Sequence, residues 1–204
     1  MGEIKVFKSK RNRVALVERA GEAVVEKAFT NPEDGERAAT VYALLQGTRL
    51  KTPRLIKLDG GVMTLSYLRG QSLLEVLEAQ EESAAVDFAV WEQLADWLLD
   101  FNKLTGLIMS DVNLRNFLLE DESGETAGLD FEECRQGDAC EMAAKLCAFV
   151  LLYDPPYTAA KQSIAEHVQA CFAQRLGCHT ERLRLLTERE IIIIQDRRQA
   201  KNGQ

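Results

Sequence analysis

SDVNLRNFLLEDESGETAGLDFEE, residues 110–133, combines acidic side chains with short apolar runs. Asp111 and Asn116 lie just before the apolar letters FLL, and Asp130 follows GL and precedes Phe131. The turn-forming letters DESGE, between FLLE and TAGL, predict a β-hairpin that returns Asp130 toward the earlier pair. A carboxylate within an apolar run is costly unless a partner or a cation compensates its charge. We therefore expect a binding site in this stretch.

The whole chain has the composition of a soluble protein with one large domain or two small lobes. It has 204 residues, of which 46% are hydrophobic and 28% charged, and a formal net charge of −7. This charge argues against a protein that coats nucleic acid, since phosphate contacts need clustered Lys and Arg. No apolar run reaches signal-peptide or membrane-spanning length, so we expect a cytoplasmic protein without a membrane span.

Short runs with strand character fill the first third of the chain. They are EIKVF, RVALVE, EAVVEKAF, PRLIKL and VMTLSYL, with the turn signals AG and GG between neighbouring runs. Between the third and fourth runs, Thr30 or Asn31 is a candidate helix N-cap and Gly47 a stop signal. The apolar spacing of this helix is only fair, so the prediction depends on its end signals. The positions at this spacing are Ala39, Tyr42, Ala43 and the polar Gln46.

The remaining two thirds are mostly helical. SLLEVLEAQ begins with Ser72 and has Glu75 three residues later, which is the pattern of a capping box. SAAVDFAVWEQLADWLLDFNKL has apolar residues at helical spacing, DACEMAAKLCAFVLLYD is apolar almost all round, and two amphipathic helices follow. The composition changes near Gly70. We therefore predict an α+β fold, with a small antiparallel β lobe plus a helix over residues 1–69 and a larger helical lobe over residues 70–204.

The spacing of Asp111, Asn116 and Asp130 suits phosphoryl transfer. Such a site needs a carboxylate that accepts the proton of the attacking hydroxyl, and oxygen ligands for Mg²⁺, which few protein groups hold. Asp111 would be the base, and Asn116 and Asp130 would be the metal ligands. The pattern D-x-x-x-x-N is a weak signal by itself, and the hairpin that carries Asp130 strengthens it.

Two further parts of such a site are candidates upstream. A Lys from a strand contacts the nucleotide phosphates and is oriented by a Glu of the next helix. EAVVEKAF offers Lys27, and the helix after it offers Glu36, with Glu33 as a competitor. A solvated charge at a strand edge is the alternative for Lys27. VMTLSYLRG looks like a hinge between lobes, where the Ser66 carbonyl and the Leu68 amide would face an adenine base.

With these residues the chain resembles the protein-kinase-like superfamily, especially its compact bacterial and archaeal branch. That branch includes aminoglycoside/choline-type phosphotransferases, RIO-type kinases, lipopolysaccharide sugar kinases and the small kinase subunit of the tRNA threonylcarbamoyl-modifying complex. SDVNLRNFLL stands where these families have H-G-D-x-x-x-x-N, and GLDFEE where they have I-D-F/W-x-x. The resemblance implies a two-lobed kinase-like fold that uses ATP and Mg²⁺, with the residue roles given above.

The sequence also departs from this family pattern. Met109 and Ser110 replace the usual His and Gly, and FKSKRNRVAL lacks the glycines of a phosphate-covering loop. The basic run from Lys8 to Arg13 could contact phosphates through charge, or it could be a solvated hairpin. Glu132 could be a further metal ligand or a surface acid.

The segment after Asp130 bears on the acceptor. Seven residues, FEECRQG, separate Asp130 from Asp138, and no A-P-E motif follows, so a phosphorylation-gated peptide kinase is not expected. We expect a Mg²⁺·ATP-dependent phosphotransferase for the hydroxyl of a small molecule, a sugar or a lipid head group, or an atypical small protein kinase or ATPase. A pseudokinase that binds nucleotide without turnover and a plain interaction domain are the alternatives.

The basic tail allows two interpretations. It is either the frayed end of a last helix or a docking segment for a protein or RNA partner. Its basic residues are Arg197, Arg198 and Lys201.

Overall fold

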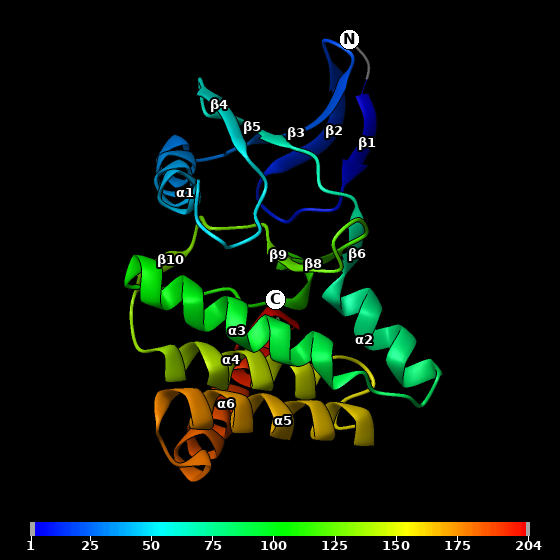
Figure 1. Cartoon of the computed structure of the whole chain (residues 1–204), viewed down its shortest axis with the longest axis vertical. Coiled ribbons are helices and arrows are strands. Elements are labelled where there is room, and N and C mark those ends of the chain that lie inside the picture. The colour runs from blue at the N-terminus through cyan, green and yellow to red at the C-terminus, as the bar shows by residue number, and fades with distance from the viewer. Residues whose placement is uncertain (1–2, 203–204) are drawn as a thin grey trace.

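The computed structural model describes residues 3–202, with side chains up to residue 200. It is an α+β structure with a sheet region at one end and a helical region at the other (Figure 1). The sheet region has five antiparallel strands in the order β1-β2-β3-β5-β4. Its elements are β1 (Glu3–Phe7), β2 (Arg13–Arg19), β3 (Glu22–Ala28), α1 (Pro32–Leu45), β4 (Leu55–Asp59) and β5 (Val62–Ser66). The predicted strands and helix are confirmed.

The tight turns of the sheet have the backbone that their sequence predicts. Ala20 and Gly21, between β2 and β3, have φ values of 51° and 84°. Gly60 and Gly61, between β4 and β5, have φ values of 55° and 78°. Two successive residues with positive φ match the right-handed twist of the flanking strands, which is why glycine is favoured in such turns.

The helical region contains five helices among the described residues. They are α2 (Leu73–Glu82), α3 (Phe88–Thr105), α4 (Ala139–Leu152), α5 (Ala159–Leu176) and α6 (Thr180–Asn202). The capping box of Ser72 and Glu75 at the start of α2 is confirmed. Arg197 and Arg198 lie within α6, whereas the side chain of Lys201 is outside the described ones. No helix within residues 3–202 is both long and apolar enough to span a bilayer.

Short strands join the two regions. β6 (Gly70–Ser72), β8 (Phe117–Glu120) and β9 (Thr126–Gly128) form a three-stranded sheet, and β7 (Leu107–Met109) pairs with β10 (Cys134–Gln136). The hairpin of β8 and β9 was predicted, whereas β6, β7 and β10 were not. Each of these three has only three residues, which is too short for an alternating pattern to show. The chain crosses from the sheet region to β6 at residues 67–69.

One hydrophobic core runs through both regions. Phe131 stands at its centre and stacks on Phe101 and Trp97 of α3, with ring centroids 5.7 and 6.2 Å away. Tyr42 of α1 meets the same ring edge-on at 4.7 Å. Aromatic pairs at such distances contribute beyond their buried area. The residue after Asp130 is therefore fixed between α1 and α3.

A buried ion pair ties α2 to the start of α5. The side chain of Lys161 is 0% exposed, and its Nζ lies 2.7 Å from Glu81 Oε2. The same ammonium donates to the Pro155 carbonyl at 2.8 Å. The Thr158 hydroxyl also donates to the Glu81 carboxylate. Each charged group thus has the partners that burial requires.

Candidate functional site

The β8–β9 hairpin brings Asn116 and Asp130 to the same place. Phe117 pairs with Gly128, and beyond this pair the Leu129 amide donates to the Asn116 carbonyl at 2.9 Å. Asn116 therefore enters the hairpin where Asp130 leaves it. The predicted grouping of these two residues agrees with this register, since the ends of antiparallel paired strands meet.

The loop before the hairpin folds back on Asp111. η1 (Leu114–Asn116) is a single 3₁₀ turn, and Asn113 caps it by accepting from the Arg115 amide at 3.0 Å. Asn116 Nδ2 donates to the Asp111 carbonyl at 3.0 Å. The D-x-x-x-x-N spacing is thus the length of one capped turn that closes on its own first residue.

Asp111 is partly buried, and this burial affects its pKa. Burial raises its pKa above the ordinary value, and the negative charges of Glu133 and Asp130 add to this effect. Hydrogen bonds from Asn116 and Asn113 oppose it. A partly desolvated carboxylate is a stronger proton acceptor than a solvated one, which suits a general base.

Lys27 reaches Asp130 from the sheet region. It lies on β3, and its Nζ is 2.9 Å from Asp130 Oδ1 and 2.8 Å from Glu132 Oε2. The side chain of Lys27 is 11% exposed. The structure thus brings four predicted site residues to one place: Lys27, Asp111, Asn116 and Asp130.

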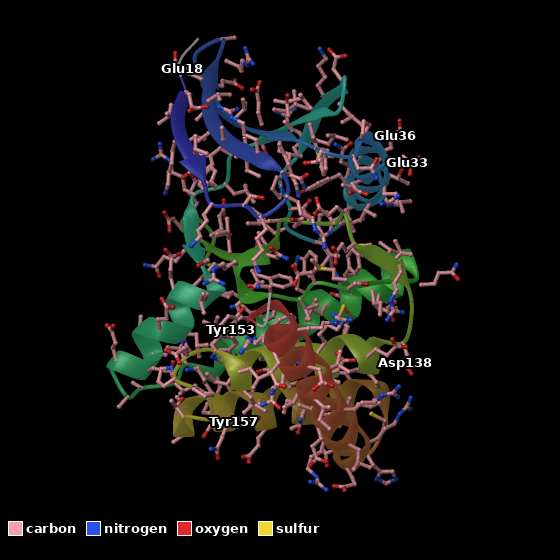
Figure 2. All side chains as sticks on the ribbon, turned by 180° about the vertical axis from the view of Figure 1, so that it is seen from behind. Glu18, Glu33, Glu36, Asp138, Tyr153 and Tyr157 are labelled. Atoms are coloured by element: carbon pink, nitrogen blue, oxygen red, sulfur yellow. The ribbon has the colours of Figure 1, made fainter. Side chains whose placement is uncertain are left out.

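The predicted pairing of Lys27 with Glu36 is wrong in this structure, because Lys27 is paired with Asp130 and Glu132. Glu36 and its competitor Glu33 are exposed on the outer side of α1 (Figure 2). Instead, α1 turns Tyr42 inward, and its hydroxyl donates to the Leu129 carbonyl. The buried face of α1 is Gly35, Ala38, Val41, Tyr42 and Leu45. A glutamate at position 36 falls outside this stripe at 3.6 residues per turn.

The loop between β1 and β2 closes over the segment after Asp130. Asn12 Nδ2 donates to Glu132 Oε2 at 2.6 Å, and Arg11 forms an ion pair with Glu133. Thr30 steadies the loop, since its amide donates to Asn12 Oδ1 at 3.1 Å. We call the Asn12–Glu132 and Arg11–Glu133 contacts the loop latch. The basic run therefore binds carboxylates in this structure.

The face of the sheet above the site is apolar. Residues paired directly across strands share a face, and Val25, two residues before Lys27, pairs with Leu16 and Leu65. Leu16 and Leu65 are buried. Val25 and Leu65 therefore belong to the covered face of the sheet, in the same core as Met63 beside Lys27.

The predicted hinge residues lie where the chain leaves the sheet. The Ser66 amide donates to the Arg54 carbonyl at 2.9 Å, and Ser66 pairs with Val24 in the ladder. Within residues 3–202 the Leu68 amide has no hydrogen-bond acceptor. Their contact with an adenine base remains a prediction.

A magnesium ion fits the site only together with a ligand. The described residues contain no group of three or more His, Cys, Asp or Glu side chains arranged for a metal. Asn116 and Asp130 supply two oxygen donors, and Mg²⁺ is commonly held by one or two protein groups with phosphates and water. A surface hollow of about 520 Å³ lies elsewhere, beside Leu50, Lys51 and Arg54. Around Lys27 itself, the space is filled by its ion pairs with Asp130 and Glu132.

Gly128 gives a test of how the hairpin packs. A Cβ at this position would lie 2.5 Å from two ring carbons of Trp97, a side chain that is 5% exposed. We expect Gly128→Ala to lower the free energy of unfolding by about 1–3 kcal/mol and to change the near-ultraviolet circular dichroism of the tryptophans. Urea denaturation measures the first effect.

Gly124→Ala is the matched control at the tip of the same hairpin. A Cβ there meets no atom within 4 Å, although its φ of 67° disfavours alanine. We expect some loss of stability and no change in the tryptophan spectrum. A Gly128→Ala protein with both wild-type stability and a wild-type spectrum would contradict the packing described.

The sequence matches no protein-family model and no curated protein.

Proposed function

We propose that this protein is a Mg²⁺·ATP-dependent phosphotransferase with a two-lobed, protein-kinase-like fold. The observation that carries the proposal is the ion pair of Lys27 with Asp130, at 2.9 Å, on the hairpin that also carries Asn116. This ion pair connects a cation of the sheet region to the hairpin that carries both candidate metal ligands. A triphosphate with its metal needs these opposite charges side by side.

The residues divide into three roles. Lys27 would contact the α- and β-phosphates, and Asn116 and Asp130 would hold Mg²⁺, which would supply neutralising charge for the transferred group. Asp111 orients the acceptor hydroxyl and takes its proton. The hydroxyl oxygen forms a bond to the γ-phosphorus while the bond from that phosphorus to the bridging oxygen breaks. ADP leaves with the electron pair.

Glu132 takes the place in which Glu36 was expected. Its carboxylate lies 2.8 Å from Lys27 Nζ, and its side chain is 13% exposed. Because it also accepts from Asn12, Glu132 holds both Lys27 and the β1–β2 loop in place. The sequence left its role open between metal ligand and surface acid, and we assign it to positioning Lys27.

The short segment from Phe131 to Asp138 supports a small acceptor. β10 and its flanking turns fill this segment, and Asp138 caps α4 by accepting from the Cys140 amide at 2.8 Å. Such a segment has no length with which to bind a peptide. The acceptor is therefore a hydroxyl of a small molecule, a sugar or a lipid head group, in preference to a protein substrate.

A nucleotide-binding module without turnover is the second candidate. The observation that favours it is the carboxylate environment of Lys27, which Asp130 and Glu132 both contact. A nucleotide must displace part of this arrangement before its phosphates reach Lys27. Hydrolysis of ATP or transfer of its phosphate separates the two candidates.

A thermal-shift titration with ATP and Mg²⁺, alone and together, tests nucleotide binding. We expect ATP with Mg²⁺ to stabilise the wild type by about 2.7 kcal/mol at 100 times Kd, since the ligand binds only the folded state. Asp130→Asn should remove the Mg²⁺-dependent part. Asp121→Asn, an exposed site on the same hairpin, is the control that keeps it. A shift indifferent to Mg²⁺ and to Asp130 would refute the proposal.

A further inference from the structure

Three cationic side chains surround the loop that carries Asp111. Arg115 is exposed on η1, Lys145 of α4 donates to the Ser110 carbonyl at 3.2 Å, and Arg198 of α6 donates to the Leu152 carbonyl at 3.0 Å. None of the three forms an ion pair with a carboxylate of the described residues. In a chain with net charge −7, cations left without acids beside one loop require an explanation.

Tyr153 links the loop of Arg115 to the chain segment that Arg198 contacts. Its hydroxyl donates to Asn113 Oδ1 at 2.8 Å and accepts from the Leu114 amide at 2.9 Å. Arg115 follows Leu114 in the chain, and Arg198 is bound to the residue before Tyr153. Figure 2 shows the inner end of α6 close to Tyr153. Tyr153 therefore connects the loop that carries Arg115 to the segment that Arg198 contacts.

The titration of Tyr153 agrees with this placement. Burial raises its pKa to about 12, and the hydrogen bond from Leu114 together with the charges of Arg115 and Arg198 opposes the increase. The charge of Asp111 acts in the same direction as burial. The charges of Arg115, Arg198 and Asp111 thus all influence the phenol of Tyr153.

We propose that Arg115 and Arg198 form an anion site for the acceptor, so that the substrate is a small hydroxyl compound that carries a phosphate or carboxylate group. This inference rests on the proposed phosphotransferase function and deepens it. The planar guanidinium group matches both anions and binds them through paired hydrogen bonds. An acceptor anchored beside Tyr153 has its free hydroxyl near Asp111.

The reaction at this site is a transfer of one phosphoryl group. The acceptor hydroxyl oxygen bonds to the γ-phosphorus of ATP, its proton passes to Asp111, and ADP leaves with the electrons of the broken bond. The anionic group of the acceptor takes no part in the bond changes. Arg115 and Arg198 would therefore contribute to acceptor binding and leave ATP binding unchanged.

Inorganic phosphate is the first probe, since it needs no knowledge of the acceptor. The full chain is saturated with Mg²⁺ and a non-hydrolysable ATP analogue, which fills the site at Lys27, and its melting temperature is followed as phosphate is added. We expect a saturable increase for the wild type. Arg115→Gln and Arg198→Gln should each raise the phosphate Kd about tenfold, and Arg115→Lys should lose less.

Arg189→Gln is the matched control, since Arg189 is exposed on the same helix as Arg198 but more than two turns earlier. It should retain the wild-type phosphate Kd. A parallel titration with glycerate distinguishes a carboxylate ligand from a phosphate ligand. Phosphate binding equal to the effect of chloride at matched ionic strength, or unchanged in the Arg115→Gln/Arg198→Gln double variant, overturns the anion site.

The anion site and the proposed function fail in different ways. If the nucleotide analogue binds all variants and the phosphate Kd is the same with and without the two arginines, the anion site is refuted. The nucleotide site is then retained. If the analogue does not bind the wild type, the proposed function is refuted. Phosphate titration of Lys27→Met, which lacks the competing cation, then decides the anion site alone.

Discussion

Asp111→Asn is expected to lower the rate of phosphoryl transfer about 10²–10⁴-fold while the affinity for Mg²⁺·ATP stays near that of the wild type. The amide has the shape of the carboxylate but cannot accept the proton of an attacking hydroxyl. Asp111 itself makes no ion pair among the described residues, so its replacement breaks no ion pair. Steady-state kinetics with ATP as the varied substrate separates the two effects.

The pH dependence of the wild type gives a second readout of Asp111. Burial raises its pKa, so the carboxylate is protonated at a higher pH than an ordinary aspartate. A protonated base is inactive, and the rate should therefore fall as the pH is lowered through this raised pKa. Asp121→Asn should follow the wild-type profile. An Asp111→Asn protein with at least a tenth of the wild-type rate would exclude Asp111 as the base.

The second large effect is expected at Lys161. Its side chain is 0% exposed and holds Glu81 at 2.7 Å, so Lys161→Ala leaves that carboxylate without its charge partner and opens a cavity. We expect the free energy of unfolding to fall by about 3–5 kcal/mol. Urea denaturation at neutral pH measures the change.

A double variant separates the ion pair from the packing. Lys161→Met with Glu81→Leu removes both charges and keeps apolar volume, so we expect it to recover much of the stability lost in Lys161→Ala. Lys57→Ala removes one partner of an exposed pair and should leave stability unchanged within error. A Lys161→Ala protein as stable as the Lys57→Ala control would show that the buried pair contributes little.

The parts of the structure that the sequence predicted are those with local signals. The hairpin around DESGE and the capping box at Ser72 depend on residues only a few positions apart, and both are confirmed. The helix that became α1 had correct end signals but an incorrect inner face. Its predicted stripe included Ala39 and Gln46, whereas Ala38 and Leu45 are buried. The buried face of α1 is thus shifted by about one position from the predicted one. This shift also leaves Glu36 exposed and away from Lys27.

The contacts that the sequence could not predict are long-range. Lys27 meets Asp130 across 103 positions, and Asn12 meets Glu132 across 120. A single sequence contains no information on which distant side chains pair. It therefore leaves Glu132 open between metal ligand and surface acid, and it predicts no contact for Asn12. The buried position of Lys161 was equally hidden, because a lysine in an amphipathic helix is usually solvated.

The two contacts of the loop latch differ in how strongly salt weakens them, and this difference bears on ligand release. Under the proposed function, a nucleotide bound beneath the β1–β2 loop would leave only after both contacts of the latch had broken. The Arg11–Glu133 pair is exposed and is screened by salt, whereas Asn12 is 8% exposed and its contact with Glu132 is sheltered from ions. Salt should therefore speed the breaking of the Arg11–Glu133 pair and have little effect on the breaking of the Asn12–Glu132 contact. The contact of Asn12 with Glu132 is therefore the part of the latch that added salt leaves in place.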